Sequence, residues 1–289
     1  MNKAEICCIV KNEERFVREW AEWHLGQGFE HISLFEDFGS RSHSSALEGV
    51  DGVDIFRLDG NAWGLENRHS SLTQLELYEW FLLERKKDGR CGWVAFIDVD
   101  EFVMFEDGWS LDRLCGNFRD YTGVLLSWKF FGANGHVSRP AGGVMESYTK
   151  EGGDDGCHSR WQVKSLVNVA VANGMKNLHV VSGGVKTDLS SDIDGPLVFD
   201  KAWINHYFSK SWEDWVDRMT SRGNFHNDYR TYDSFFYANP DMRGQMEELI
   251  ESVRDRRLVS SQWLSRELGL IAGGNKERIE GLERCYGLA

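Results

Sequence analysis

The chain has 289 residues, and its 33 Lys and Arg against 46 Asp and Glu leave a formal charge of −13. Hydrophobic residues make up 41 %, which is too many for a disordered chain. A net acidic surface repels the phosphates of DNA and RNA, so we expect no nucleic acid partner. The length suits one large domain or two small ones with a substantial core.

The sequence contains no apolar run of the roughly 18 residues that cross a membrane. The run at residues 6–10 is too short for the core of a signal peptide, so we expect a cytoplasmic protein without a transmembrane segment. Peripheral contact with a membrane stays open. The six cysteines form no C-x-x-C pair and have no zinc spacing, which predicts reduced structural thiols.

The amino-terminal part predicts a strand, a helix and a second strand. Residues 6–10 are continuously apolar, as in a strand that is buried on both faces of a parallel sheet, and Lys11-Asn12-Glu13 interrupts them. Aromatic residues then recur at near-helical spacing over 14–27, before an apolar strand at 31–35. Polar residues thus follow both strands, and ligands of open α/β sheets bind at such carboxyl ends.

The rest of the chain predicts an α/β domain over residues 1–211 and a helical carboxyl-terminal extension over 212–289. We expect further strands at 53–58, 93–97, 123–131 and 166–172, helices at 71–87, 212–221, 242–256, 260–268 and 276–285, and mobile loops at 151–158 and 183–195.

A carboxylate pair follows the apolar strand predicted at 93–97. Asp98 and Asp100 are two residues apart, and in a strand such residues share a face. Carboxylates crowded at the end of a buried strand repel one another, and Mg²⁺ or Mn²⁺ would relieve that repulsion. The simpler interpretation is a solvated strand end, because D-x-D alone is a weak signal.

Four blocks, in order, resemble the family 2 and family 92-like glycosyltransferases. The first comprises Lys11-Asn12-Glu13, Glu19-Trp20 with Trp23-His24, and His31; the second is residues 93–102, WVAFIDVDEF. The third is residues 127–132, SWKFFG, and the fourth is residues 204–211, INHYFSKS. The resemblance covers about residues 6 to 225 and implies a GT-A fold, a Rossmann-type mixed sheet flanked by helices. The segment after the second strand departs from the family, because Asp37 has no second Asp near it.

The resemblance implies a role for each matching residue. Asp100 would ligate the metal, Asp98 would contact the ribose or the metal through water, and His206 would complete the metal site. The nucleotide would be held by Asn12, Glu13 and Asp37, and the leaving diphosphate would be neutralised by Lys164, Lys210 or Arg68. An acceptor hydroxyl would need a carboxylate base, for which Glu146 and Asp228 are candidates. Each of these residues also has a structural interpretation, as a turn or cap residue, a core histidine or a surface charge.

The function predicted from the sequence is a metal-dependent, inverting glycosyltransferase. Its donor would be a nucleoside-diphosphate sugar, expected to be UDP-linked, and its acceptor the hydroxyl of a glycan or glycoconjugate. A nucleotide-sugar-binding protein without catalysis stays open. A nucleotidyltransferase or phosphohydrolase using the same carboxylates is less favoured, because no glycine lies in the first turn. The lack of G-x-G-x-x-G after the first strand also disfavours a dehydrogenase.

Overall fold

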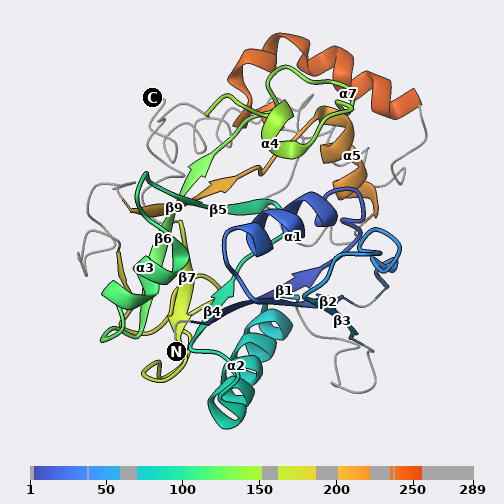
Figure 1. The fold of residues 1–289 in the computed structure, drawn as a ribbon. Helices are drawn as coiled ribbons and strands as arrows, with labels where there is room; N and C mark the ends of the chain where they lie inside the picture. The colour runs from blue at the N-terminus through green and yellow to red at the C-terminus, as the bar shows by residue number, and fades with distance from the viewer. Residues whose placement is uncertain are drawn as a thin grey trace. The chain divides into compact units, whose positions relative to one another are not determined.

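The computed structural model describes residues 3–37, 39–58, 70–151, 162–186, 201–221, 235–236 and 238–255 (Figure 1). The chain forms two compact units that alternate along the sequence. One unit contains Met1–Lys129 and Ser159–His206, and the other contains Phe130–His158 and Tyr207–Ala289.

The first unit is built on a mixed sheet with strand order β3-β2-β1-β4-β7-β6-β9-β5. Its parallel part contains β1 (Ala4–Val10), β2 (His31–Glu36), β3 (Val53–Arg57) and β4 (Trp93–Phe96). The strand β7 (Val163–Asn168) runs antiparallel to β4 and to β6 (Gly123–Phe130), and β5 (Glu101–Phe105) runs antiparallel to β9 (Ala202–His206). The short β8 (Val185–Lys186) pairs with β6 in parallel. This arrangement confirms the predicted α/β class with a mixed central sheet.

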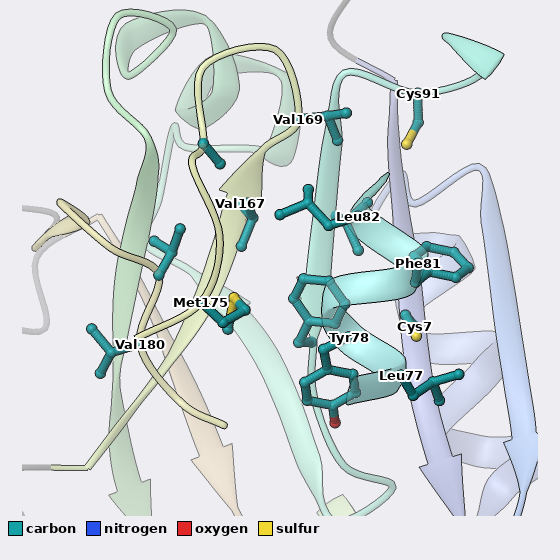
Figure 2. Packing of buried hydrophobic residues seen from close by; sticks show 14 of the residues in the cluster. Cys7, Leu77, Tyr78, Phe81, Leu82, Cys91, Val167, Val169, Met175 and Val180 are labelled. Carbon is teal, nitrogen blue, oxygen red and sulfur yellow. The ribbon is translucent and has the colours of Figure 1, made fainter. Parts of the chain in front are cut away.

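Helices α1 (Val17–Gly26) and α2 (Ser70–Asp88) lie on opposite sides of the parallel strands (Figure 1). Figure 2 shows the core under α2, where Tyr78 and Phe81 pack with Cys7 of β1 and Val167 of β7. Every side chain of this core is apolar or aromatic, so its burial is the main source of the unit's stability. A further helix, α3 (Leu111–Asn117), starts at the N-cap Ser110, whose hydroxyl accepts a hydrogen bond from the Arg113 N–H.

The second unit contains α4 (Val144–Ser147), α5 (Trp212–Ser221), the 3₁₀ helix η1 (Pro240–Gln245) and α7 (Met246–Asp255). Trp212, Trp215 and Phe235 lie in its buried core. The first turn of α5 is capped by Ser211, whose hydroxyl accepts a hydrogen bond from the Asp214 N–H at 3.1 Å and donates one to Asp214 Oδ2 at 2.7 Å. The KS block in the sequence therefore marks the start of a helix.

Most predicted elements are confirmed, and their errors have local causes. The first helix begins at Val17 instead of residue 14, after a turn in which the Glu13 carbonyl accepts the N–H groups of Phe16 and Val17. The strand predicted at 166–172 is β7 at 163–168, because the side chain and carbonyl of Asn168 accept bonds that turn the chain. The helix predicted at 242–256 starts as η1, where Pro240 occupies the first turn. Strands β5 and β9 were not predicted from the sequence, and each is paired with a segment far from it along the chain. The helices predicted at 260–268 and 276–285 lie outside the described residues.

The thiols predicted to be reduced are free and buried at Cys7, Cys8, Cys91 and Cys115. Burial raises the pKa of the Cys7 thiol well above its ordinary value, so it has little thiolate character. The other two cysteines lie outside the described part of the chain. Among the described helices, none has both the length and the apolar character needed to span a membrane.

Candidate active site

The carboxyl ends of the parallel strands bring several predicted site residues to one edge of the sheet. Asn12 and Glu13 follow β1, Asp37 follows β2 and Asp98 comes shortly after β4. Because β2, β1 and β4 are neighbours and run in parallel, the segments that follow them leave the sheet at the same edge. Polar groups on separate stretches of the sequence are thereby collected where a ligand of an α/β sheet binds.

The D-x-D pair lies in a closed turn between β4 and β5, after the end of the strand predicted at 93–97. The Glu101 N–H donates to the Asp98 carbonyl at 3.0 Å, and the Asp98 N–H donates to Glu101 Oε2 at 2.9 Å. These two bonds close the turn, so strand pleating does not decide where the carboxylates of Asp98 and Asp100 point. The geometry of the turn depends instead on the side chain of Glu101.

A buried ammonium group holds the turn from within the sheet. Lys164 Nζ, on β7, lies 2.9 Å from Asp98 Oδ2 and 3.6 Å from Glu101 Oε2, and its side chain is 1 % exposed. Burial by itself lowers the pKa of Lys164. The carboxylates of Asp98 and Glu101 raise that pKa by more than burial lowers it, so the amine stays charged. For Asp98, burial by itself raises the pKa of the carboxyl. The positive charge of Lys164 lowers that pKa by more, so Asp98 stays ionised. The side chain of Gln74 reaches the other Asp98 oxygen at 3.4 Å.

Glu101 is enclosed completely, with no exposed side-chain surface. Burial raises the pKa of its carboxyl well above the ordinary value; Lys164 opposes this, and the charges of Asp98 and Asp100 add to it. Oε2 accepts the Asp98 N–H, whereas Oε1 has no hydrogen-bond partner among the residues that the structure describes. A buried oxygen in this position normally has a partner, such as water, an ion or a ligand.

Asp100, within this turn, lies close to His206 of β9. His206 is the cross-strand neighbour of Glu101 in the β5–β9 pair, and its Nε2 lies 3.7 Å from Asp100 Oδ1. Both side chains are buried, and the ring centroid of Trp128 lies 4.2 Å from that of His206. The pair offers one carboxylate and one imidazole, a donor set that suits Mn²⁺ and, less well, Mg²⁺.

The described residues contain no group of three or more His, Cys, Asp or Glu side chains placed to hold a metal ion. A complete protein cage is therefore not found in this part of the chain. Mg²⁺ and similar ions, however, commonly take one or two protein ligands and complete their shell with water and substrate phosphate. Asp100 and His206 fit such an open site, whereas Asp98 Oδ2 is already held by Lys164.

His179 belongs to this region, although no sequence signal pointed to it. Its ring packs edge-on against Trp128, with 5.4 Å between the ring centroids. Burial, followed by the positive charge of Lys164, lowers the pKa of His179 to about 4, so the imidazole is neutral near pH 7. Ser165 of β7 fixes the surrounding loop, because its hydroxyl donates to the His179 carbonyl at 2.8 Å and accepts the Val181 N–H at 2.8 Å.

The helix α1 holds β5 by side-chain hydrogen bonds to its backbone. Trp20 Nε1–H donates to the Glu101 carbonyl at 2.8 Å, and Trp23 Nε1–H donates to the Val103 carbonyl at 3.0 Å. The Val103 N–H donates to His24 Nε2 at 3.1 Å. The Trp and His residues of the first sequence block therefore satisfy backbone groups of β5, and Trp20 anchors the residue that closes the D-x-D turn.

The remaining predicted residues are distributed as follows. Lys210, in the second unit, is buried and has a φ of 54°, one of three positive values among the described non-glycine residues. Glu146 lies on α4 of the same unit and is exposed. Asp228 and Arg68 lie outside the described residues. Trp128, from the third sequence block, is buried beside His206.

Comparison with curated proteins finds similarity over about three quarters of the chain. A glycosyltransferase family 92 protein of Oryza sativa is 23 % identical over 230 residues, which are 75 % of this chain and 35 % of that protein. A family 92 protein of Ricinus communis is 25 % identical over 75 % of this chain and 37 % of its own length. A family 92 protein of Arabidopsis thaliana is 22 % identical over 78 % of this chain and 38 % of its own length. The chain thus spans little more than a third of the length of the curated relatives that it matches.

No family model matches the chain. Among solved structures, HddC from Yersinia pseudotuberculosis is 10 % identical with a TM-score of 0.29, over 62 % of this chain and 74 % of that one. A 4-diphosphocytidyl-2C-methyl-D-erythritol synthase is 10 % identical with a TM-score of 0.31, over 59 % of this chain and 77 % of that one. Scores this low leave the fold to be judged from the sheet topology itself. In sequence, the chain resembles the family 92 glycosyltransferases.

Proposed function

We propose that this chain is a glycosyltransferase that transfers the sugar of a nucleoside-diphosphate sugar, expected to be UDP-linked, to a hydroxyl group of a glycan or glycoconjugate. The observation that carries the proposal is the buried contact between Asp100, in the closed turn of Asp98 to Glu101, and His206 of β9. This pair lies near the carboxyl end of β4, the edge where the residues expected to bind nucleotide also gather. The family 92 names of the sequence relatives support the same reaction class.

In this proposal, Asp100 and His206 hold Mn²⁺ or Mg²⁺, and Asn12, Glu13 and Asp37 hold the nucleotide. When bound, the ion would neutralise the diphosphate as it leaves. Lys164 acts through Asp98, because its ammonium is enclosed between two carboxylates and is not exposed to a ligand. The positive charge of Lys164 also reduces the repulsion among the carboxyl groups of Asp98, Asp100 and Glu101. The chain's net charge of −13 is in keeping with a bound metal ion, because such an ion would reduce the repulsion between an anionic donor and an acidic protein.

The inverting outcome requires a carboxylate that takes the proton of the acceptor hydroxyl. Glu146 and Asp228 stay our predictions for this base, and Lys210 stays a candidate contact of the diphosphate. A cytoplasmic location also stays a prediction from the sequence.

The test combines thermal unfolding with donor hydrolysis. We expect UDP with Mn²⁺ to raise the melting temperature and UDP with EDTA to leave it unchanged, because only a ligand that binds the folded state stabilises it. A panel of UDP-, GDP- and dTDP-sugars with Mn²⁺ should identify a donor that the purified protein slowly hydrolyses. A lack of response to every nucleotide and sugar would contradict the proposal.

Two matched variants separate the metal assignment from general effects of charge. Asp100→Asn should abolish the response to UDP and Mn²⁺, because it removes the carboxylate charge at nearly constant shape. Asp54→Asn makes the same change on β3, where the side chain is 57 % exposed and pairs with His31, and it should keep the full response. If Asp100→Asn responds as the wild type does, the metal assignment is wrong even where the donor assignment holds.

A further inference from the structure

We propose that Glu36 and His43 are positioning residues that hold the loop after β1 in its ligand-binding conformation. The inference rests on the proposed function, because it concerns the nucleotide end of the same site. It also explains the segment after β2, where the sequence departs from the family pattern. No sequence signal had marked either residue.

The loops that follow β1 and β2 are joined by hydrogen bonds. The Asn12 N–H donates to Ser40 Oγ at 3.2 Å, and the Arg41 N–H donates to Asn12 Oδ1 at 3.0 Å. Asn12 has a φ of 55°, in the left-handed region that few non-glycine residues adopt. Asn adopts this conformation more readily than other non-glycine residues, and hydrogen bonds to its surroundings can fix it. Here the partner loop enforces it from both sides of the residue.

Glu36 and His43 continue this connection into the core. Glu36 Oε1 accepts the His43 backbone N–H at 2.6 Å and lies 3.1 Å from His43 Nδ1. His43 Nε2 lies 3.1 Å from the Glu13 backbone nitrogen, whose hydrogen points to it. One arrangement satisfies all three contacts: Nδ1 carries the hydrogen and donates to Glu36, and Nε2 accepts from Glu13. The imidazole thus connects Glu36 of β2 to the backbone of the loop after β1 by hydrogen bonds.

Burial makes this chain of contacts rigid. Glu36 is 3 % exposed, His43 0 % and Glu13 7 %. Inside a protein, polar groups that lose a partner are costly, so a satisfied buried network holds a single geometry. The backbone of Asn12 and Glu13 is therefore fixed before a ligand arrives, and a preorganised site binds more tightly because no ordering occurs on binding.

The test measures binding of UDP in the presence of Mn²⁺ by titration calorimetry, with GDP and dTDP as further arms. His43→Leu removes the donor and the acceptor, and we expect the Kd to rise about tenfold, the size of one lost hydrogen-bond contribution. His43→Gln keeps one donor and one acceptor and should recover binding to within about threefold. Amide exchange at residues 12–13 should speed up in His43→Leu and stay slow in His43→Gln.

The control removes a buried ion pair at the opposite end of β1, where the side chains are about as buried. Arg85 Nε lies 2.6 Å from Glu5 Oε2, and the two side chains are 9 % and 7 % exposed. Arg85→Met should lower the melting temperature and leave the Kd within about threefold of the wild type, which separates loss of stability from loss of positioning. If His43→Leu does not fold, Ser40→Ala replaces it: it removes the acceptor of the Asn12 N–H and should weaken binding about threefold.

The outcomes distinguish the two proposals. If the wild type binds no nucleotide, the proposed function is wrong and the positioning role is wrong with it. A second outcome is that the wild type binds nucleotide, while His43→Leu, or Ser40→Ala used in its place, binds it equally well and shows unchanged amide exchange. In that case only the positioning role is wrong. Equal loss of binding in Arg85→Met would also overturn it, because a general loss of stability would then account for the effect.

Discussion

His24 connects α1 to β5 only in its neutral form, and this makes the stability of the protein depend on pH in a defined way. Its Nδ1 lies 2.8 Å from the Trp20 carbonyl, and its Nε2 accepts the Val103 N–H at 3.1 Å. The ring is fully buried, and burial lowers the pKa of His24 from 6.5 to about 3, against a smaller opposing effect of the Trp20 carbonyl. A proton added to Nε2 would remove the acceptor that Val103 needs.

The size of the effect follows from linkage between protonation and folding. Between pH 6.5 and about 3 the unfolded chain binds a proton at His24 that the folded chain excludes. The stability that the neutral ring contributes is therefore complete above pH 6.5 and is lost as the pH falls toward 3. The loss is about 1.4 kcal/mol for each pH unit, so about 2 kcal/mol at pH 5.

The assay compares urea unfolding of the wild type with that of His24→Gln at about pH 7.5 and pH 5. At the higher pH the variant should be less stable by about 1–3 kcal/mol, because Gln replaces the buried contacts imperfectly. Gln does not titrate, so the difference between the two proteins should shrink by about 2 kcal/mol at pH 5.

Trp20→Phe is the matched control, because it removes the hydrogen bond to the Glu101 carbonyl and leaves the titrating ring in place. Its stability should stay below that of the wild type by a similar amount at both pH values. A constant difference between wild type and His24→Gln across this range would refute the reasoning, since it would show that His24 binds its proton equally well in the folded and unfolded states.

Two further predictions concern stability and use the same urea assay. Arg85→Met should cost about 3–5 kcal/mol, because it leaves the Glu5 carboxylate buried without its partner, whereas Lys87→Met, in an exposed ion pair, should cost under about 1 kcal/mol. Gly123→Ala should cost about 1–3 kcal/mol, because a Cβ there would lie 2.8 Å from the backbone of β7, whereas Gly26→Ala, with no atom within 4 Å, should be close to neutral. A cost for either control that matches its partner variant would contradict these assignments.

The resemblance to the family singled out Asp98, Asp100 and His206 in the sequence, but the contacts that shape their surroundings come from distant positions. Asp98 and Lys164 are 66 residues apart, and they meet because β7 runs antiparallel to β4. Glu101 and His206 are cross-strand neighbours only because β5 pairs with β9. Spacing along the sequence holds no information on such pairings, and so the role of Lys164 as the partner of Asp98 could not be predicted.

By itself, the sequence determined the parallel strands, since an apolar run such as residues 93–96 is stable only where both faces of a sheet are covered. It also determined which polar residues follow those strands, and hence the edge of the sheet at which a ligand would bind. Only the tertiary structure decided that the D-x-D pair lies in a closed turn, that His43 contacts Glu13 and Glu36, and that His179 packs against Trp128. The physical reason is that hydrogen bonds and charges act over a few ångströms in space, and the packing of distant segments sets those distances.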